Sequence, residues 1–284
     1  MLKQRIITAL ILVPLVIAGL FLLSPLHFAL LALALSMLAA WEWALLAGFE
    51  NKAVRAGIAV ICGLGLGASL LAVSVQDTSI LLQNTFIRTV LIIAPLWWLL
   101  ALGLVLGYPS SAKWWHNAKR LKVLFGLLTL VPFFWGLIVL RMYSYSVDSS
   151  FGAVWILYLL FLIWGADSGA YFTGKAFGKH KLAPKVSPAK TWEGVIGGLT
   201  TSAVIAVVFD HFSPLQAGTH SMIISSVIAV AVSVLGDLTE SMFKREAGVK
   251  DSGQIMPGHG GVLDRIDSLT AAVPVFACLL LLVF

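Results

Sequence analysis

The sequence contains few charged residues. Only 11% of its 284 residues are Asp, Glu, Lys or Arg, whereas soluble domains carry about one quarter. Because 60% of the residues are hydrophobic, this composition excludes an ordinary water-soluble domain. Cysteine is also scarce. Cys62 and Cys278 lie in apolar runs without a CxxC partner, so neither a disulfide framework nor a thiolate metal site is indicated.

Long hydrophilic stretches are missing as well. The longest segments outside the apolar runs are 174–191 and 240–264, and neither approaches the roughly 50 residues of an independent domain. No small-residue cleavage site followed by a soluble domain is found near the N-terminus, so we expect the first apolar segment to be retained. Any ligand as large as a nucleotide must therefore be bound by helix ends and short loops.

Apolar runs account for most of the chain. A helix of about 20 apolar residues crosses the hydrocarbon core of a bilayer. Runs near this length occur at residues 5–23, 27–49, 55–75, 86–107, 121–141, 152–173, 192–209, 221–239 and 265–284. The sequence therefore predicts an all-α polytopic membrane protein with about nine transmembrane helices.

Two pairs of glycines have a spacing that suits close helix packing. Gly63 and Gly67 form one GxxxG pair, and Gly194 and Gly198 form another. Such pairs allow the backbones of two helices to approach closely. We expect them to serve packing within one chain and do not take them as a dimer signal.

The basic residues indicate an orientation. With the N-terminus in the cytoplasm, all but two of the 19 Lys and Arg residues fall on the cytoplasmic side, and only Arg88 and Arg141 fall opposite. Lys and Arg concentrate in cytoplasmic loops of membrane proteins. We therefore expect a cytoplasmic N-terminus and a C-terminus on the opposite side. The net charge of +6 then reflects orientation, and no nucleic-acid partner is expected.

Residues 241–267 form the densest charged segment, between two apolar runs. Charged groups near hydrocarbon cost several kcal/mol unless they pair, bind metal or reach water, so such a cluster predicts a functional site. A helix continuing beyond Asp237 would place Ser241, Lys244 and Arg245 on one face. The glycine-rich part that follows would let backbone amides approach phosphate oxygens.

Asp264 and Asp267 lie three residues apart, on one face of the next helix. Carboxylate oxygens are ligands that Mg²⁺ prefers, so the segment predicts a combined phosphate and metal site. Its candidate residues are Asp237, Ser241, Lys244, Arg245, Lys250, Asp251, His259, Gly260, Gly261, Asp264, Arg265 and Asp267.

Structural roles are the alternatives at several of these positions. Asp264 alone could cap a helix N-terminus, and Asp237 alone could pair with Lys244 or Arg245. His259 could be a metal ligand, a hydrogen-bond donor to phosphate or a brace for the loop. Glu42 and Glu193 could be structural partners of the basic loops, and we assign Glu42 no role at this point.

A second polar group precedes the other long loop. Asp167 and Ser168 lie within an apolar segment, and residues 174–191 then carry five lysines and no acid. The bias of basic residues toward the cytoplasm explains these lysines equally well. Together with the first cluster they predict the other wall of a polyanion pocket, with contacts from Asp167, Ser168, Lys185, Ser187 and Lys190.

The run from residue 241 to 267 resembles the C-terminal signature of phosphatidate cytidylyltransferases, also called CDP-diacylglycerol synthases. Met256 stands where this family more usually has a branched or aromatic apolar residue. Residues 164–171 and 187–194 are also similar to that family. The resemblance covers roughly residues 160–268, and the N-terminal half is similar only in its hydrophobic character.

The resemblance implies transfer of a cytidylyl group from CTP to phosphatidate at the cytoplasmic face of a bacterial inner membrane. It also implies a requirement for Mg²⁺, a second, monovalent cation such as K⁺, and a homodimer. We expect residues 1–150 to form a membrane scaffold with oligomer contacts and residues 151–284 to form the catalytic region. The expected catalytic residues are Asp237, Ser241, Lys244, Asp264 and Asp267.

The same hypothesis divides the binding roles. Asp237, Asp264 and Asp267 bind the metal, with Ser241 as an additional oxygen ligand. His259, Gly260 and Gly261 cradle pyrophosphate. The triphosphate or the lipid phosphate is bound by Lys244, Arg245, Lys250 and Arg265, with Asp251 in the same substrate-binding group.

Two other functions remain open. A CTP-dependent lipid-alcohol kinase, such as a polyprenol kinase, resembles the same C-terminal region. An ion-coupled transporter would use Glu42, Asp167 and Asp237 to line its pathway. The location of the charges at one membrane face argues against the transporter.

Overall fold

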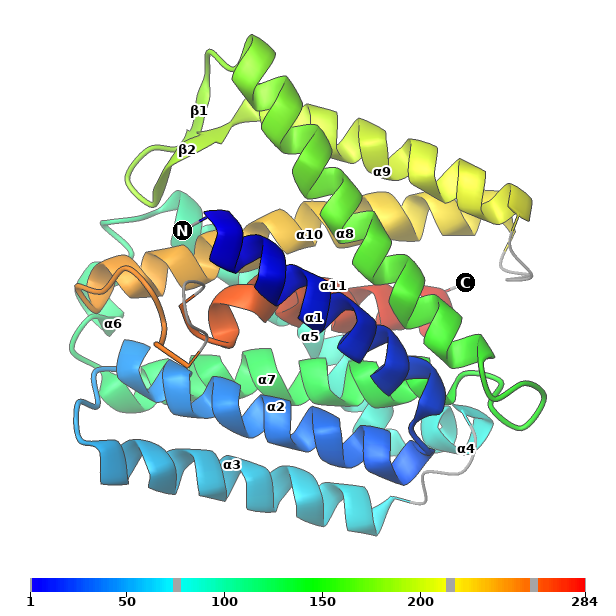
Figure 1. The fold of residues 1–284 in the computed structure, drawn as a ribbon. Coiled ribbons are helices and arrows are strands. Elements are labelled where there is room, and N and C mark those ends of the chain that lie inside the picture. Colours follow the sequence, from blue (N-terminus) through cyan, green and yellow to red (C-terminus); the bar gives the residue numbers. More distant parts are fainter. Residues whose placement is uncertain (1, 74–77, 213–217, 256–259, 284) are drawn as a thin grey trace.

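The computed structural model describes residues 2–73, 78–212, 218–255 and 260–283. These residues form a bundle of long helices and one small hairpin (Figure 1). The elements in chain order are α1 (Leu2–Leu22), α2 (Pro25–Leu46), α3 (Lys52–Ala72), α4 (Thr78–Gln83), α5 (Thr85–Leu106), α6 (Ala112–Trp115), α7 (Lys119–Met142), α8 (Phe151–Phe177), β1 (Lys181–Ala183), β2 (Ser187–Thr191), α9 (Trp192–Phe212), α10 (Thr219–Glu246), α11 (Leu263–Cys278) and the π-helical turn η1 (Leu279–Val283).

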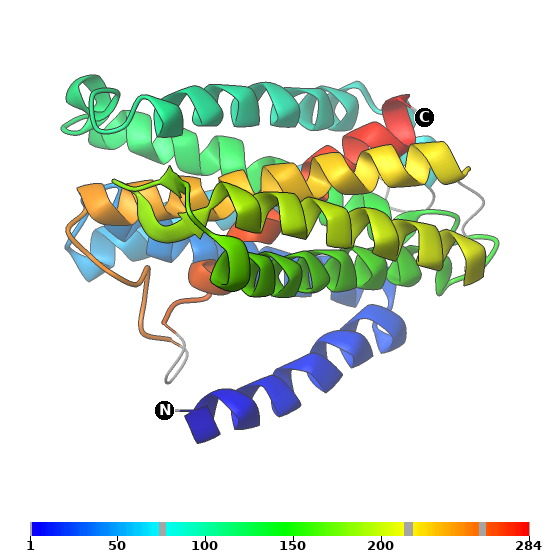
Figure 2. The ribbon, with the colours of Figure 1, turned by 90° about the horizontal axis from the view of Figure 1, so that it is seen from above.

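The described residues contain eight helices that are long and apolar enough to cross a membrane. They correspond to the last eight apolar runs, and the predicted polytopic all-α architecture is confirmed. The first run forms α1, a helix of 21 residues from Leu2 to Leu22. Figure 2 shows α1 diverging from the other helices. The count of nine crossings therefore stays a prediction.

Consecutive long helices run in opposite directions (Figure 1). The start of α1, the α2–α3 and α5–α7 connections, the β1–β2 hairpin and the segment between α10 and α11 consequently lie at one end of the bundle, which we call the hairpin end. Arg88, near the start of α5, and Arg141, near the end of α7, lie at the opposite end. The structure thus agrees with the predicted separation of basic residues, while the side that faces the cytoplasm stays a prediction.

Glycines allow α8 to lie directly against α9. A Cβ atom built on Gly194 would lie 3.0 Å from the carbonyl oxygen of Ala170, and one on Gly198 would lie 3.0 Å from that of Ala166. A Cβ on Gly63 would lie 2.5 Å from the sulfur of Met37 on α2. The predicted use of these glycines for packing within one chain is confirmed.

Aromatic side chains connect the N-terminal helices to α10 near the hairpin end. The ring of Phe243 on α10 lies 5.1 Å from Trp43 of α2 and 4.9 Å from Trp115 of α6, measured between ring centroids. Trp43 also donates a hydrogen bond from Nε1 to the carbonyl oxygen of Lys122 at 2.7 Å. Buried aromatic contacts of this kind fix helices relative to one another, so the last turns of α10 have a defined position.

Candidate active site

The last turns of α10 present a stripe of polar side chains, because residues three or four positions apart share a helix face. Ser241 donates from Oγ to Asp237 Oδ1 at 3.2 Å, and Lys244 Nζ lies 2.9 Å from Glu240 Oε2. The predicted alignment of Asp237, Ser241 and Lys244 is confirmed, whereas Arg245, predicted on the same face, is exposed and donates to Val186 of the hairpin. Glu240 belongs to the same stripe and was missed, although its position four residues before Lys244 was a usable signal.

Lys244 also reaches across to α11. Its Nζ lies 2.7 Å from Asp264 Oδ1. The other carboxylate oxygen of Asp264, Oδ2, accepts hydrogen bonds from the backbone amides of Ser252 at 2.9 Å and Gly261 at 2.7 Å. Asp264 therefore holds Ser252 close to the start of α11. The capping alternative is not observed, because the N-cap residue of α11 is Val262 and Asp264 accepts from amides that precede the helix.

Gly260 is required for this arrangement. Its φ angle is +85°, a backbone conformation that favours glycine. A Cβ atom at this position would lie 2.7 Å from Asp264 Oδ2. The backbone at Gly260 and Gly261 lies close to the Asp264 carboxylate, while its predicted approach to phosphate oxygens stays a prediction. His259 lies outside the described residues.

The three aspartates assigned to one metal ion have different partners. Among the described residues, no three His, Cys, Asp or Glu side chains are grouped so that they could hold a metal ion. Asp264 is bound to Lys244 and to two backbone amides, while Asp237 Oδ2 lies 2.7 Å from Lys190 Nζ. Lysines and amides already contact two of the three carboxylates, so the three-aspartate ion site stays a prediction.

The site nevertheless contains more acids than lysines. Asp267 interacts electrostatically with Asp237 and Glu240, and Asp167 interacts with Asp237 and Lys190. Glu240 Oε1 is buried and accepts from no donor in the described part of the chain, and the Glu240 and Asp267 side chains lie within hydrogen-bonding reach of each other. Buried carboxylate oxygens without partners are costly, and oxygen is the ligand that Mg²⁺ prefers. These acids therefore supply oxygen atoms of the type that a divalent cation prefers.

The 174–191 segment is more regular than a loop. Residues up to Phe177 continue α8, and β1 pairs antiparallel with β2. The hairpin is tied to α10 at two places: Lys190 forms the ion pair with Asp237, and Arg245 Nε donates to the carbonyl oxygen of Val186 at 3.3 Å. The basic segment and the acidic stripe thus form one site, as the polyanion-pocket hypothesis requires.

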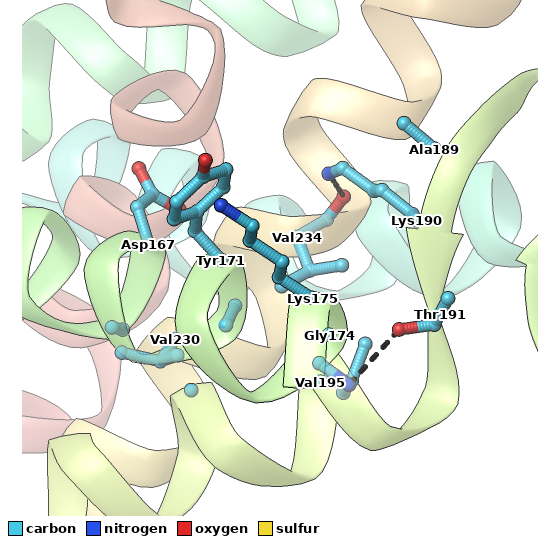
Figure 3. A pocket seen from close by; sticks show the side chains of 14 residues that line it. Asp167, Tyr171, Gly174, Lys175, Ala189, Lys190, Thr191, Val195, Val230 and Val234 are labelled. Carbon is cyan, nitrogen blue, oxygen red and sulfur yellow. Dashed lines mark hydrogen bonds between the residues drawn. The ribbon is translucent and has the colours of Figure 1, made fainter. Parts of the chain in front are cut away.

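A cavity of about 390 Å³ lies between α8, α9, α10 and β2. Figure 3 shows the side chains of Asp167, Lys175 and Lys190 on its walls, with Lys190 near the carbonyl oxygen of Val234. Ligand sites for small molecules usually have volumes of about 300 to 1,000 Å³. Lys175 was not among the predicted contacts, whereas Ser168 is absent from the cavity lining and donates its hydroxyl to Trp164 of its own helix.

A second cavity, of about 410 Å³, lies on the other side of the hairpin against α5, α9 and α10. Its lining is almost entirely apolar and includes the side chains of Leu102, Leu106, Leu182 and Leu235, with Lys185 as its only charged residue among those described. Val195 and Val234 line both cavities. Sequence patterns did not reveal this groove, because its walls come from four separate elements.

Four predicted phosphate-binding or substrate-binding side chains reach the surface at the hairpin end. Arg245, Lys250, Asp251 and Arg265 are exposed, and none forms an ion pair with another described residue. Lys185 is also exposed, and Ser187 is half-buried at the start of β2. The exposed arginines and lysines of this set can therefore bind a soluble or lipid phosphate. Lys190 and Lys244, in contrast, already form ion pairs with acids.

Comparison with known proteins assigns the chain to a family. The model of the cytidylyltransferase family matches residues 3–283. Phosphatidate cytidylyltransferase of Haemophilus influenzae is 50% identical over 281 residues, which are 98% of each chain. The protein of the same name from Pseudomonas aeruginosa is 46% identical over 281 residues, covering 99% of this chain and 97% of the relative.

A more distant relative matches only half of the chain. Phosphatidate cytidylyltransferase of Staphylococcus haemolyticus is 45% identical over 140 residues, which are 49% of this chain and 54% of that protein. The family model and the two full-length relatives cover nearly the whole chain. This chain is a member of the cytidylyltransferase family.

Proposed function

We propose that this protein transfers a cytidylyl group from CTP to phosphatidate and so forms CDP-diacylglycerol and pyrophosphate. The observation that carries the proposal is the ion pair between Lys190 and Asp237, which joins the basic hairpin to the acidic face of α10 beside a cavity of suitable size. Relatives with this named activity match nearly the whole chain at 46% and 50% identity.

The reaction requires little covalent chemistry from the protein. A phosphate oxygen of phosphatidate attacks the α-phosphorus of CTP, the bond from that phosphorus to the bridging oxygen breaks, and pyrophosphate leaves with the electron pair. The protein must align two polyanions and offset their mutual repulsion. We assign this role to Arg245, Lys250 and Arg265, which are exposed, and to Lys190 and Lys175 in the cavity wall.

We propose that Mg²⁺ is bound by Asp237 and Asp267, with Ser241 beside them. Asp237 is the more accessible of the paired acids, with 35% of its side chain exposed, and Asp267 is its electrostatic neighbour. Bound Mg²⁺ would supply positive charge to phosphate oxygens. Asp264 then has a different task, because its contacts with Lys244, Ser252 and Gly261 order the turn. We also propose that the protein binds a monovalent cation such as K⁺, and we assign no ligands to it.

The apolar cavity suits the acyl chains of the lipid substrate. Leu102 and Leu106 in its wall are 40% and 71% exposed, so the groove is accessible from the outer surface of the bundle. Acyl chains that remain in an apolar environment avoid a cost of about 0.8 kcal/mol per methylene. We propose that the headgroup lies near Lys185 and Lys190 while the acyl chains lie along α5 and α10.

We also propose that the hairpin end faces the cytoplasm of a bacterium, with the protein in its inner membrane. The positive-inside rule supports this orientation, because all basic residues of the described loops between helices lie at the hairpin end. The two full-length relatives are bacterial. A homodimer is part of the same proposal, based on the family resemblance.

An assay with CTP labelled at the α-phosphorus tests the activity. Purified protein with phosphatidate and Mg²⁺ should place the label on the lipid, and omission of phosphatidate or Mg²⁺ should prevent labelling. A lipid-alcohol kinase would instead release labelled CDP and transfer label to lipid only from the γ-phosphorus. Solute uptake by proteoliposomes without any nucleotide dependence would favour the transporter.

A further inference from the structure

Helix α2 contains a buried acid that the proposed reaction does not use. Glu42 is 0% exposed, and it belongs to the N-terminal half of the chain, far from the charged segment in sequence. Burying a carboxylate costs several kcal/mol unless hydrogen bonds replace its water. Hydrogen bonds must therefore offset the cost of burying Glu42.

Glu42 accepts its hydrogen bonds from Ser252, within the segment between α10 and α11, and from the first residues of α11. Its Oε1 accepts from the Val262 amide at 3.0 Å. Its Oε2 accepts from the Leu263 amide at 2.7 Å and from the Ser252 hydroxyl at 3.2 Å. Val262 and Leu263 start α11, where helix amides lack partners within the helix and favour a negative charge. Glu42 thus acts as a cap supplied by another helix.

The surrounding backbone is shaped to admit this carboxylate. A Cβ atom on Gly253 would collide with Glu42, and one on Gly261 would lie 2.5 Å from Glu42 Oε2. The nearby Arg55 interacts electrostatically with Glu42, but its Nε donates to the carbonyl oxygen of Trp41 at 3.1 Å. The close fit of Glu42 is therefore with the turn, since no described basic side chain forms an ion pair with it.

Two carboxylates bind the segment between α10 and α11, which we call the turn. Glu42 binds the Ser252 hydroxyl and the first amides of α11, while Asp264 binds the Ser252 and Gly261 amides. We infer that Glu42 is a positioning residue for cytidylyl transfer. By fixing this turn, Glu42 keeps the backbone of the turn and the ion pair between Lys244 and Asp264 in the geometry needed to bind the phosphates of CTP. The inference rests on the proposed function and gives the N-terminal half a role beyond spanning the membrane.

Glu42→Gln is the most informative variant. Both carboxylate oxygens accept from backbone amides, so the amide group of Gln would place a donor against a donor while keeping the size of the side chain. We expect the KM for CTP to rise about 10- to 100-fold, since a lost bond to a charged acceptor has this order of effect. The KM for phosphatidate should stay within about twofold, and hydrogen exchange of residues 251–255 and 260–263 should accelerate.

Two further variants separate positioning from stability. Ser252→Ala removes one of the three hydrogen bonds and should give a smaller rise in the KM for CTP, even if Glu42→Gln fails to fold. Gly253→Ala leaves Glu42 in place but displaces its carboxylate, and it should reproduce the Glu42→Gln defect. Ser36→Ala is the matched control, because Ser36 is also fully buried in α2 but bonds only to Ala32 of its own helix.

The kinetics and the hydrogen exchange of these variants can contradict the inference. If Ser252→Ala, Gly253→Ala and any folded Glu42→Gln protein keep the wild-type KM for CTP and wild-type exchange of the turn, Glu42 has no positioning role. An equal fall in activity toward both substrates, matched by the loss of folded protein, would make its role purely structural. Wild-type protein that leaves phosphatidate unlabelled would instead contradict the proposed function, and the exchange measurement would still test the contact between Glu42 and the turn.

Discussion

Lys244 of α10 and Asp264 of α11 form an ion pair with 2.7 Å between Nζ and Oδ1. Their side chains are only 14% and 5% exposed, so water screens the pair weakly. Glu240 shares the same ammonium group at 2.9 Å. One lysine therefore compensates two buried acids, and the charge balance of the site depends on it.

Replacement of Lys244 by Met should destabilise the protein and abolish transfer. Breaking a buried pair by removing one partner typically costs about 3–5 kcal/mol, because the other charge remains buried. Thermal unfolding in detergent should show a lower midpoint, and the labelled-CTP assay should show at least a 100-fold loss. Lys113→Met is the control, since Lys113 is exposed at the same end of the bundle. Equal unfolding midpoints for the two variants would show that Lys244 does not stabilise the buried acids.

Asp267→Asn should change the metal requirement. Removing one of the two carboxylates assigned to Mg²⁺ should raise the Mg²⁺ concentration for half-maximal activity about tenfold or more, because each ligand contributes to binding. A titration of activity against Mg²⁺ measures this. Asp148→Asn removes a charge at the opposite end of the bundle, where Asp148 bonds to Ser150, and should leave the titration unchanged. An unchanged titration for Asp267→Asn would remove this residue from the metal site.

A large side chain in the apolar groove should affect the lipid substrate alone. Leu102→Trp fills part of the groove, so we expect a several-fold higher KM for phosphatidate, a smaller effect with short acyl chains and no change for CTP. Leu100→Trp is the control, because Leu100 is also on α5 and 49% exposed but does not line the groove. Equal kinetics for the two variants with long-chain and short-chain phosphatidate would place the acyl chains elsewhere.

The contact between α8 and α9 should not tolerate a side chain at Gly198. A Cβ there meets the Ala166 carbonyl oxygen at 3.0 Å, whereas a Cβ at Gly65 meets nothing within 4 Å. Gly198→Leu should therefore lower the thermal midpoint by several degrees and reduce activity, since the overpacked helices must separate at a cost of about 1–3 kcal/mol. Gly65→Leu should be nearly neutral. Similar thermal midpoints for the two variants would show that separating α8 from α9 does not destabilise the protein.

Cysteine labelling in intact cells would establish the orientation. Cys62 and Cys278 are buried, so background reaction should be low. A cysteine at Lys181 in the hairpin should resist a membrane-impermeant maleimide, whereas one at Val147, which is 88% exposed at the opposite end, should react. The reverse pattern would place the hairpin end outside the cytoplasm.

The helices were predictable because their signal is local. Apolar runs of sufficient length found all eight of the long helices among the described residues, and the spacing of Asp237, Ser241 and Lys244 gave the stripe on α10. The hairpin was not predicted. Its second strand reads Ser-Pro-Ala-Lys-Thr, which lacks the alternation and the branched residues that mark a strand.

The assignment of partners was less predictable, because it depends on contacts between distant segments. Residue types in the sequence indicated a site of acids and cations, yet they did not show that Asp264 would bind Lys244 and two backbone amides. The link from Glu42 to Leu263 spans 221 positions. No local pattern encodes such a contact, so the sequence left Glu42 without a role.

The fit of Glu42 against Gly253 and Gly261 limits how the two halves of this protein can change. A side chain larger than hydrogen at either glycine would occupy the volume that the Glu42 carboxylate fills. Substitutions of these glycines should therefore be tolerated only together with a smaller residue at position 42. Chimeras that exchange the C-terminal half between relatives should work only when α2 and the turn come from compatible parents. Helix α2 and the turn are therefore expected to evolve as one unit.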